Sequence, residues 1–292
     1  MPELPEVETV RRGLSELIVH KTVADVTHDT PKSFPNTDAS VSSFLIGSEI
    51  MAVRRRAKVL IVDLSTNYSL LIHLKMTGQM VFVAPDVRFG AGHPNNSLID
   101  QLPDKSTRVT ITFDDGAQLF FNDQRKFGWI KLLPTLEIPN TDFMKKVGPE
   151  PLVEDFTAEQ FAARFKRRAK TSIKAAMLDQ SVVAGVGNIY ADESLWGANI
   201  HPARFVNTIT EQEFETLYHE LRDVMNLAIE KGGSSNHTYV NAEGKKGSYM
   251  NFARVFRREG LPCPRCGTII EKIRVAGRGT HVCPFCQKLS MS

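Results

Sequence analysis

The sequence has no long uncharged apolar run, no basic leader followed by a small-residue cleavage site, and no cysteine before residue 263. The first absence argues against a membrane-spanning helix, and the second argues against a secretory signal. With 292 residues, 42% of them hydrophobic, the chain is also too long and too apolar to be a small stapled scaffold. We therefore expect a soluble, cytoplasmic protein with enough residues for two domains.

Positive charge is concentrated in two segments, although the whole chain carries only +3. Residues 245–292 contain ten Lys and Arg and two Glu, a net charge of +8, which leaves −5 for residues 1–244. Residues 164–174 add six basic side chains and no acidic one. Each segment alone could be a solvated surface, but the two together indicate a polyanionic partner.

The first half of the chain has the pattern of antiparallel β-structure. Residues 43–133 alternate apolar and polar in short runs, separated by Asn, Gly and Asp-Gly turn signals. Residues 84–105 lack this periodicity and contain three Pro, two Gly and two Asn, which predicts a long exposed loop.

The second half has helical signatures. Thr157 stands three residues before Gln160 as in a capping box, and an amphipathic run over residues 211–231 ends at Gly232-Gly233. Several prolines between residues 134 and 151 mark the boundary between the halves. We find no internal repeat. The fold class expected is α+β with two domains, and the bounds expected are 1–140, 150–250 and a terminal module at 251–292.

The four cysteines have the spacing of a metal site. Two Cys-x-x-Cys pairs are separated by sixteen intervening residues, a spacing that matches structural zinc modules: Cys263, Cys266, Cys283 and Cys286. Two such pairs complete a tetrahedral shell without leaving a position for water, so we expect one structural Zn ion. Two disulfides are the alternative, but a reducing compartment disfavours them. The cations between the pairs would then face phosphate.

The first residues, Met1-Pro2-Glu3-Leu4-Pro5-Glu6, allow two interpretations. If the initiator Met is removed, Pro2 has a free secondary amine with a pKa of roughly 8 before any perturbation. Such an amine can attack a sugar carbon, and Glu3 and Glu6 can move protons for it. The alternative is an ordinary helix start, with Pro5 in the first turn and acidic residues favoured by the helix dipole.

Eight segments in the same order resemble the bacterial formamidopyrimidine-DNA glycosylases (Fpg/MutM), which are bifunctional 8-oxoguanine DNA glycosylases and AP lyases. The segments are PELPEVETV (2–10), RRAK (55–58), HLKMTG (73–78), DQRKFG (123–128), GPEPL (148–152), TSIK (171–174), AGVGNIYADESLW (184–196) and GRGTHVCPFCQ (277–287). The resemblance covers the whole chain, and PELPE rather than PEGPE is more similar to this branch than to the endonuclease VIII branch. It implies an N-terminal β-sandwich with flanking helices, followed by a helix-two-turns-helix domain and a zinc finger.

The same resemblance implies catalytic roles. Pro2 would attack C1′ of the damaged nucleoside and form a Schiff base, with Glu3 as the acid/base that opens the sugar and Glu6 beside it. Lys58 would donate a proton in β-elimination, and Arg278 would act in δ-elimination. Because arginine holds its proton tightly, stabilisation of charge is the more plausible role for Arg278. From residue types alone, a surface strand lysine beside three arginines is the preferred interpretation of Lys58.

DNA contacts are implied for seven residues. Met76, Arg125 and Phe127 resemble the side chains that fill the gap left by an extruded base, although Met76 and Phe127 could also be core residues. His73, Lys170, Lys174 and Asn188 would contact phosphates. Residues 233–247 resemble the loop that closes over flipped 8-oxoguanine.

Some positions depart from the family pattern. Lys105-Ser106-Thr107-Arg108 replaces a Lys-His-x-His run, and we expect Arg108 to compensate by contacting phosphate. The loop after Val83 is longer than usual, and the lesion loop reads Asn236-His237-Thr238. Lesion preference is therefore less well specified than lyase chemistry.

The sequence thus predicts a monomeric repair enzyme acting on duplex DNA that contains oxidised purines or abasic sites. Two alternatives stay open: a related glycosylase for oxidised pyrimidines, and a zinc-ribbon protein that binds DNA without catalysis. The second alternative leaves the free amine and its paired acids unexplained.

Overall fold

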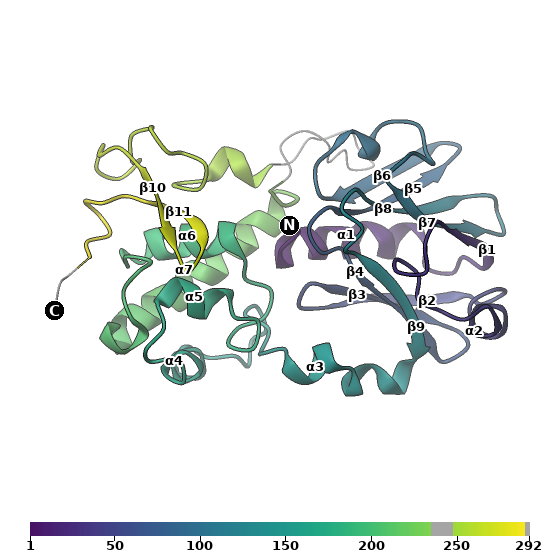
Figure 1. Ribbon diagram of the computed structural model, residues 1–292, viewed down its shortest axis with the longest axis horizontal. Coiled ribbons are helices and arrows are strands. Elements are labelled where there is room, and N and C mark those ends of the chain that lie inside the picture. Colours follow the sequence, from purple (N-terminus) through teal and green to yellow (C-terminus); the bar gives the residue numbers. More distant parts are fainter. Residues whose placement is uncertain (235–247, 290–292) are drawn as a thin grey trace. The chain divides into compact units, whose positions relative to one another are not determined.

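The computed structural model describes residues 1–234 and 248–289, in two compact units (Figure 1). Unit 1 comprises Met1–Lys145 and Ile229–Tyr249, and unit 2 comprises Lys146–Ala228 and Met250–Ser292. The loop over the flipped base was predicted at 233–247, and its residues 235–247 lie outside the described residues. The three-part division into 1–140, 150–250 and 251–292 stays a prediction.

Unit 1 is built on two antiparallel sheets, and the α+β class is confirmed. The five-stranded sheet has the order β1-β7-β8-β5-β6, with bounds Val23–His28, Thr107–Phe113, Gln118–Asp123, Gly78–Ala84 and Val87–Gly92. The four-stranded sheet has the order β2-β3-β4-β9, with bounds Ile50–Arg56, Val59–Leu64, Tyr68–His73 and Trp129–Pro134. The alternating pattern over residues 43–133 therefore indicated the correct structure.

One apolar core joins the two sheets to helix α1 (Leu4–Leu17). α1 contributes Val7, Val10 and Leu14, and it packs against strands of both sheets (Figure 1). Burial of each such side chain contributes about 1.5–3 kcal/mol. Gly13 allows the close approach, because a Cβ atom there would lie 2.1 Å from the ring of Phe89 on β6.

The outer faces of both sheets are covered by short elements. Helices α2 (Asp38–Phe44) and α3 (Asp142–Lys146) and the 3₁₀ turns η1 (Asn96–Leu98) and η2 (Thr135–Asn140) complete the N-terminal segment. On the four-stranded sheet, Ile138 of η2 packs with Val59, Ile61 and Leu71. This second apolar face explains why β3 is buried along nearly its whole length.

The prediction of a long exposed loop over residues 84–105 is partly wrong. Residues 87–92 form the edge strand β6, and Leu98 packs on Val81 and Phe120 of the five-stranded sheet. The Arg88 guanidinium holds the segment down by donating to the carbonyl oxygen of Leu98 at 3.0 Å. The Pro and Gly content masked a short hairpin, because strand pairing rather than local propensity determines the conformation there.

Unit 2 is mainly helical, as predicted. Its helices are α4 (Ala158–Lys166), α5 (Ile173–Leu178), α6 (Asn188–Gly197) and α7 (Glu211–Glu230), and η3 (Val206–Thr208) precedes α7. The Thr157–Gln160 capping box starts α4. After η4 (Tyr249–Phe252), strands β10 (Glu271–Val275) and β11 (Arg278–Val282) form the hairpin between the two cysteine pairs.

Candidate active site and DNA-contact residues

The N-terminal residues form a buried start to α1. Glu3 is the residue that caps the helix, and its backbone N–H donates to Glu6 Oε2 at 2.8 Å. Glu6 Oε1 accepts a second bond, also 2.8 Å, from the backbone N–H of Ser234. Pro2, Glu3 and Glu6 are all buried, so two carboxylates lie next to the predicted nucleophile in a region of low water access. Helix capping and proton transfer are compatible uses of this geometry.

Lys58 and His73 lie at the same end of the four-stranded sheet. Lys58 is in the two-residue turn between β2 and β3, and the next residue, Val59, pairs with His73 on β4. Lys58 is only 5% exposed, so it is not the surface strand lysine that its charge pattern also allowed. The pair brings a buried ammonium beside an imidazole.

His73 is held neutral. Burial first, and then the charges of Lys75 and Lys58, lower the pKa of His73 to about 3. Its Nδ1 accepts from the backbone N–H of Lys75 at 3.1 Å, so the neutral ring carries its hydrogen on Nε2. His73 can therefore offer a phosphate one neutral N–H donor across the physiological pH range.

Acidification should destabilise the fold through His73. An unfolded histidine titrates near 6.5, so between about pH 6.5 and 3 the unfolded chain binds the extra proton and stability falls as the pH falls. We expect this residue to lower the free energy of unfolding by about 2 kcal/mol between pH 7 and 5. In urea denaturation, the free energy of unfolding of His73→Gln should fall by about 2 kcal/mol less than that of the wild type between pH 7 and 5. The exposed His28→Gln is the control, and an equal effect in both variants would contradict the assignment.

The three predicted gap-filling side chains lie on adjacent turns of unit 1. Met76 is half-buried, whereas Arg125 and Phe127 are exposed. The Arg125 guanidinium carbon lies 4.9 Å from the centre of the Phe127 ring, and the backbone N–H of Arg125 donates to Thr77 Oγ1 at 3.0 Å. A ring that is 45% exposed beside a guanidinium is unusual for a core residue. The structure therefore places the three residues on neighbouring turns, with Arg125 and Phe127 exposed and Met76 half-buried.

Arg108 lies inside unit 1. It is 5% exposed, pairs with Asp29, and donates to the carbonyl oxygens of Asp123 and Lys105 at 2.8 and 2.6 Å. These contacts would have to break before the guanidinium could reach a phosphate. The expectation that Arg108 replaces a missing DNA-contacting histidine is not supported by this geometry.

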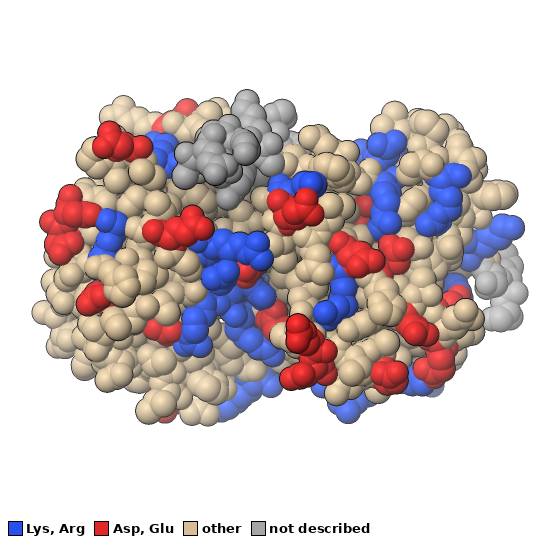
Figure 2. Space-filling view, turned by 180° about the vertical axis from the view of Figure 1, so that it is seen from behind, with Lys and Arg blue, Asp and Glu red and all other residues tan. Residues whose placement is uncertain are grey.

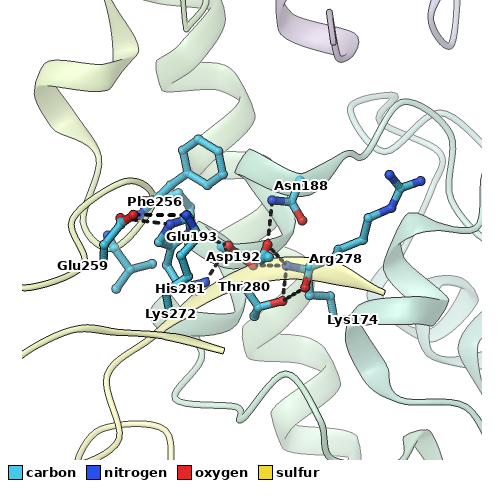
Figure 3. A network of polar contacts seen from close by, with 12 residues as sticks. Lys174, Asn188, Asp192, Glu193, Phe256, Glu259, Lys272, Arg278, Thr280 and His281 are labelled. Atoms are coloured by element: carbon cyan, nitrogen blue, oxygen red, sulfur yellow. Dashed lines mark hydrogen bonds and ion pairs between the residues drawn. The ribbon is translucent and has the colours of Figure 1, made fainter. Parts of the chain in front are cut away.

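Lys174 is also buried, in contrast to the exposed Lys170. Its side chain is 0% exposed, and its Nζ lies 2.6 Å from Asp192 Oδ1 and 2.7 Å from Thr280 Oγ1, with Gly279 O at 3.3 Å (Figure 3). Asn188, the first residue of α6, donates from Nδ2 to the same Gly279 oxygen at 3.0 Å. Lys174 and Asn188 thus hold the backbone next to Arg278, whose side chain is exposed and points away from this network in Figure 3. A direct phosphate contact by Lys174 would need this network to open.

The four cysteines fit a tetrahedral metal. Their sulfur atoms lie within 4.8 Å of one another, and all four are free thiols, so the disulfide alternative is wrong. Hydrogen bonds from the side chain and backbone of Thr268 lower the pKa of Cys266 to about 6, which favours its thiolate, whereas burial raises the pKa of Cys283 and of Cys286. Trp196 Nε1 donates to Cys263 Sγ at 3.4 Å, an outer contact of the kind that orients metal ligands.

Comparisons with known proteins agree with these features. Family profiles match residues 1–130 (formamidopyrimidine-DNA glycosylase N-terminal domain), 147–240 (the H2TH domain of the same enzymes) and 260–289 (a zinc finger found in FPG and IleRS). Formamidopyrimidine-DNA glycosylase from Pediococcus pentosaceus is 43% identical over 99% of this chain and 100% of its own length. The chain belongs to the formamidopyrimidine-DNA glycosylase family.

Solved structures of the family have the same fold. A complex of a point mutant of Lactococcus lactis FPG with Fapy-dG-containing DNA has a TM-score of 0.86 at 36% identity, covering 98% of this chain and 100% of that one. A complex of the L. lactis enzyme with abasic-site DNA gives 0.85 at 35% identity, over 98% and 99%. The predicted family, fold class and structural zinc are therefore confirmed.

Two adjacent acids on α6 were not predicted from the sequence. Asp192 accepts from the backbone N–H of His281 at 2.9 Å and from its Nδ1 at 3.1 Å, in addition to Lys174 (Figure 3). Glu193 accepts from three successive backbone N–H groups, those of residues 254, 255 and 256, at 2.8–2.9 Å. Both carboxylates are buried, so α6 anchors the zinc-finger segment through them. The sequence signal that could have revealed them is the occurrence of two consecutive acidic residues inside a mostly apolar helix.

The surface carries the charge expected of a DNA-binding family. Figure 2 shows one face on which Lys and Arg side chains form a contiguous area, with individual Asp and Glu side chains around it. Such an area attracts phosphate backbones from a distance, in a salt-dependent manner. Among the described residues, no helix is long and apolar enough to cross a bilayer.

Proposed function

We propose that this chain removes oxidised purines from duplex DNA and cleaves the resulting abasic site, as a glycosylase and AP lyase of base excision repair. Family membership supports the activity. Structural neighbours include L. lactis Fpg bound to Fapy-dG DNA and MutM bound to DNA with carbocyclic 8-oxo-G. A soluble location on the bacterial chromosome, and a monomeric state, are part of the proposal.

The observation that carries the mechanism is the buried cluster of Pro2, Glu3 and Glu6 at the start of α1. The free amine of Pro2 attacks C1′ while the bond from C1′ to the base breaks. Glu3 protonates the ring oxygen, and the opened sugar is then joined to the protein as an iminium ion. Glu6 holds the backbone of Glu3 through its 2.8 Å bond, which fixes the acid relative to the amine.

Strand cleavage follows from the iminium, which acidifies the C2′ proton. Transfer of that proton to the carboxylate left on Glu3 expels the 3′ phosphate in β-elimination, and Lys58 is the proposed donor of a proton to the departing phosphate. A second elimination expels the 5′ phosphate, and the exposed Arg278 stabilises its charge. Met76, Arg125 and Phe127 fill the gap in the duplex, while His73, Lys170 and Asn188 contact phosphates.

Replacing Lys58 with Ala should separate the two reactions. Because Lys58 acts in elimination, strand cleavage should slow by about tenfold to a hundredfold, whereas base release should change by no more than about threefold. Single-turnover assays with and without alkaline cleavage measure the two steps. Lys131→Ala removes the charge of an exposed lysine on β9 as a control. Equal losses in both steps would show that Lys58 has another role.

Borohydride trapping tests the proposed function. Reduction during reaction with an 8-oxoguanine:cytosine duplex should yield a covalent protein–DNA adduct whose mass includes a chain that begins at Pro2. Salt-sensitive DNA binding without an adduct would instead indicate a binding protein without catalysis.

Oxidised pyrimidines are the competing substrate class. L. lactis Fpg has also been solved with DNA containing an oxidised pyrimidine. We expect faster excision of 8-oxoguanine opposite cytosine than of thymine glycol, and the reverse order would place the enzyme with the pyrimidine-specific branch.

A further inference from the structure

A buried carboxylate, Asp123, lies between the turns that carry the gap-filling side chains. Asp123 is the last residue of β8 and is fully buried. Its Oδ2 accepts from the backbone N–H groups of Phe127 at 2.8 Å and Gly128 at 2.6 Å. Its Oδ1 accepts from the N–H of Arg125 at 3.1 Å and from the hydroxyl of Thr77. Four donors thus converge on one side chain.

The topology explains why these donors meet. The chain crosses from the four-stranded to the five-stranded sheet between β4 and β5, and it crosses back between β8 and β9. Gly78 pairs with Asp123, and His73 pairs with Trp129, so the two crossing segments run side by side. One carries Met76, and the other carries Arg125 and Phe127.

Thr77 joins the two crossings directly. Its hydroxyl donates to Asp123 and accepts from the N–H of Arg125 at 3.0 Å. Thr77 follows Met76 in the chain, so this hydroxyl fixes the Met76 turn to the turn that holds Arg125. Without it, Asp123 would still organise its own turn but would lose its side-chain link to the other one, leaving only the backbone pairing with Gly78.

The second crossing has little freedom to adapt. A Cβ atom on Gly128 would lie 2.5 Å from the Phe121 ring and 3.0 Å from the His73 carbonyl oxygen. Lys126 has a φ of 56°, in the left-handed region. Arg108 donates to the Asp123 carbonyl oxygen at 2.8 Å, so this buried cation also holds the end of β8 in place.

We propose that Asp123 and Thr77 are positioning residues that set the spacing between Met76, Arg125 and Phe127, so that the three enter the base stack as one rigid unit. This inference rests on the proposed function of those three side chains. Filling a gap in stacked DNA requires placement within a fraction of an ångström, because small displacements weaken all the contacts of a wedge. Neither Asp123 nor Thr77 touches the sugar chemistry in this proposal.

Thr77→Val and Thr77→Ser form a matched pair for the test. Valine keeps the size and loses the hydroxyl, whereas serine keeps the hydroxyl. Two reactions are compared under single-turnover conditions: release of 8-oxoguanine from a duplex, which needs the wedge, and cleavage of a single-stranded oligonucleotide with a preformed abasic site, which has no stack to fill. Both reactions use the same proposed nucleophile, the amine of Pro2.

Thr77→Val should slow base release by about tenfold and change single-strand cleavage by less than about twofold, while Thr77→Ser stays near wild type in both. Asp123→Asn loses the carboxylate oxygen that accepts from two backbone N–H groups. It should slow base release more than Thr77→Val does and likewise leave single-strand cleavage nearly unchanged. Parallel loss of both reactions, or no difference between the Val and Ser variants, would overturn the inference. Should the wild type form no borohydride adduct, the failure would lie in the proposed function instead. The Thr77 pair decides the question if Asp123→Asn does not fold.

Discussion

A chain with one extra glycine between Met1 and Pro2 should form no borohydride-trapped adduct with damaged DNA. Its base release and strand cleavage should both fall by at least about a thousandfold. The insertion converts the proline nitrogen into an amide, whose lone pair is delocalised and cannot attack C1′. Affinity for abasic-site DNA should change by only a few-fold, because the proposed phosphate contacts are elsewhere in the chain. Gel analysis after reduction measures the adduct, and fluorescence anisotropy measures binding.

Pro5→Ala is the control for this insertion. It alters Pro5, which lies in the first turn of α1 close to Pro2, where alanine is also a good helix former. The adduct should persist in this variant. An active insertion variant, confirmed by its N-terminal mass, would exclude Pro2 as the nucleophile.

Loss of the zinc should have the second largest effect. Cys266→Ser, or chelation of the metal, should lower DNA affinity by at least about a hundredfold while unit 1 keeps its fold. The reason is that the hairpin bearing Arg278 is held between the two cysteine pairs and has little apolar core of its own: Trp196, Val255 and Ile270 with the cysteines. Metal binding supplies most of the free energy that orders such a segment.

Trp196 provides the readout for this experiment. It contacts Cys263 Sγ at 3.4 Å, and the chain has only one other tryptophan, Trp129 in unit 1. In a Trp129→Phe background, the fluorescence of Trp196 should change with zinc content. Urea denaturation then measures the stability of unit 1 separately, and we expect that stability to stay near the native value. Metal loss with unchanged DNA binding would refute the role of zinc in bracing the hairpin.

Motifs with fixed local spacing predicted the structure well. The cysteine pairs gave the metal site, and the alternating pattern of residues 43–133 gave the antiparallel sheets. Thr157 and Gln160 gave the start of α4. In each case the signal depends on residues a few positions apart, whose relation is set by local geometry and not by the rest of the fold.

Buried charges were the part that the sequence could not resolve. Arg108 and Lys174 have the same residue types as exposed phosphate ligands, yet both lie inside their units with carboxylate partners. Those partners, Asp29 and Asp192, are 79 and 18 residues away along the chain. Which cations face solvent depends on tertiary pairing, so composition and spacing carry little information about it. Asp123 was missed for the same reason, since its donors belong to two different crossings.

The bonds of Glu6 connect the start of α1 to a residue more than two hundred positions further along the chain. One carboxylate accepts from the backbone of Glu3, next to the proposed nucleophile, and from that of Ser234, the last described residue before 235–247. Glu6 is therefore a direct polar connection between Ser234 and the backbone beside Pro2. A substitution that displaces Ser234 should slow base release through Glu6 even when Pro2 and Glu3 are unchanged.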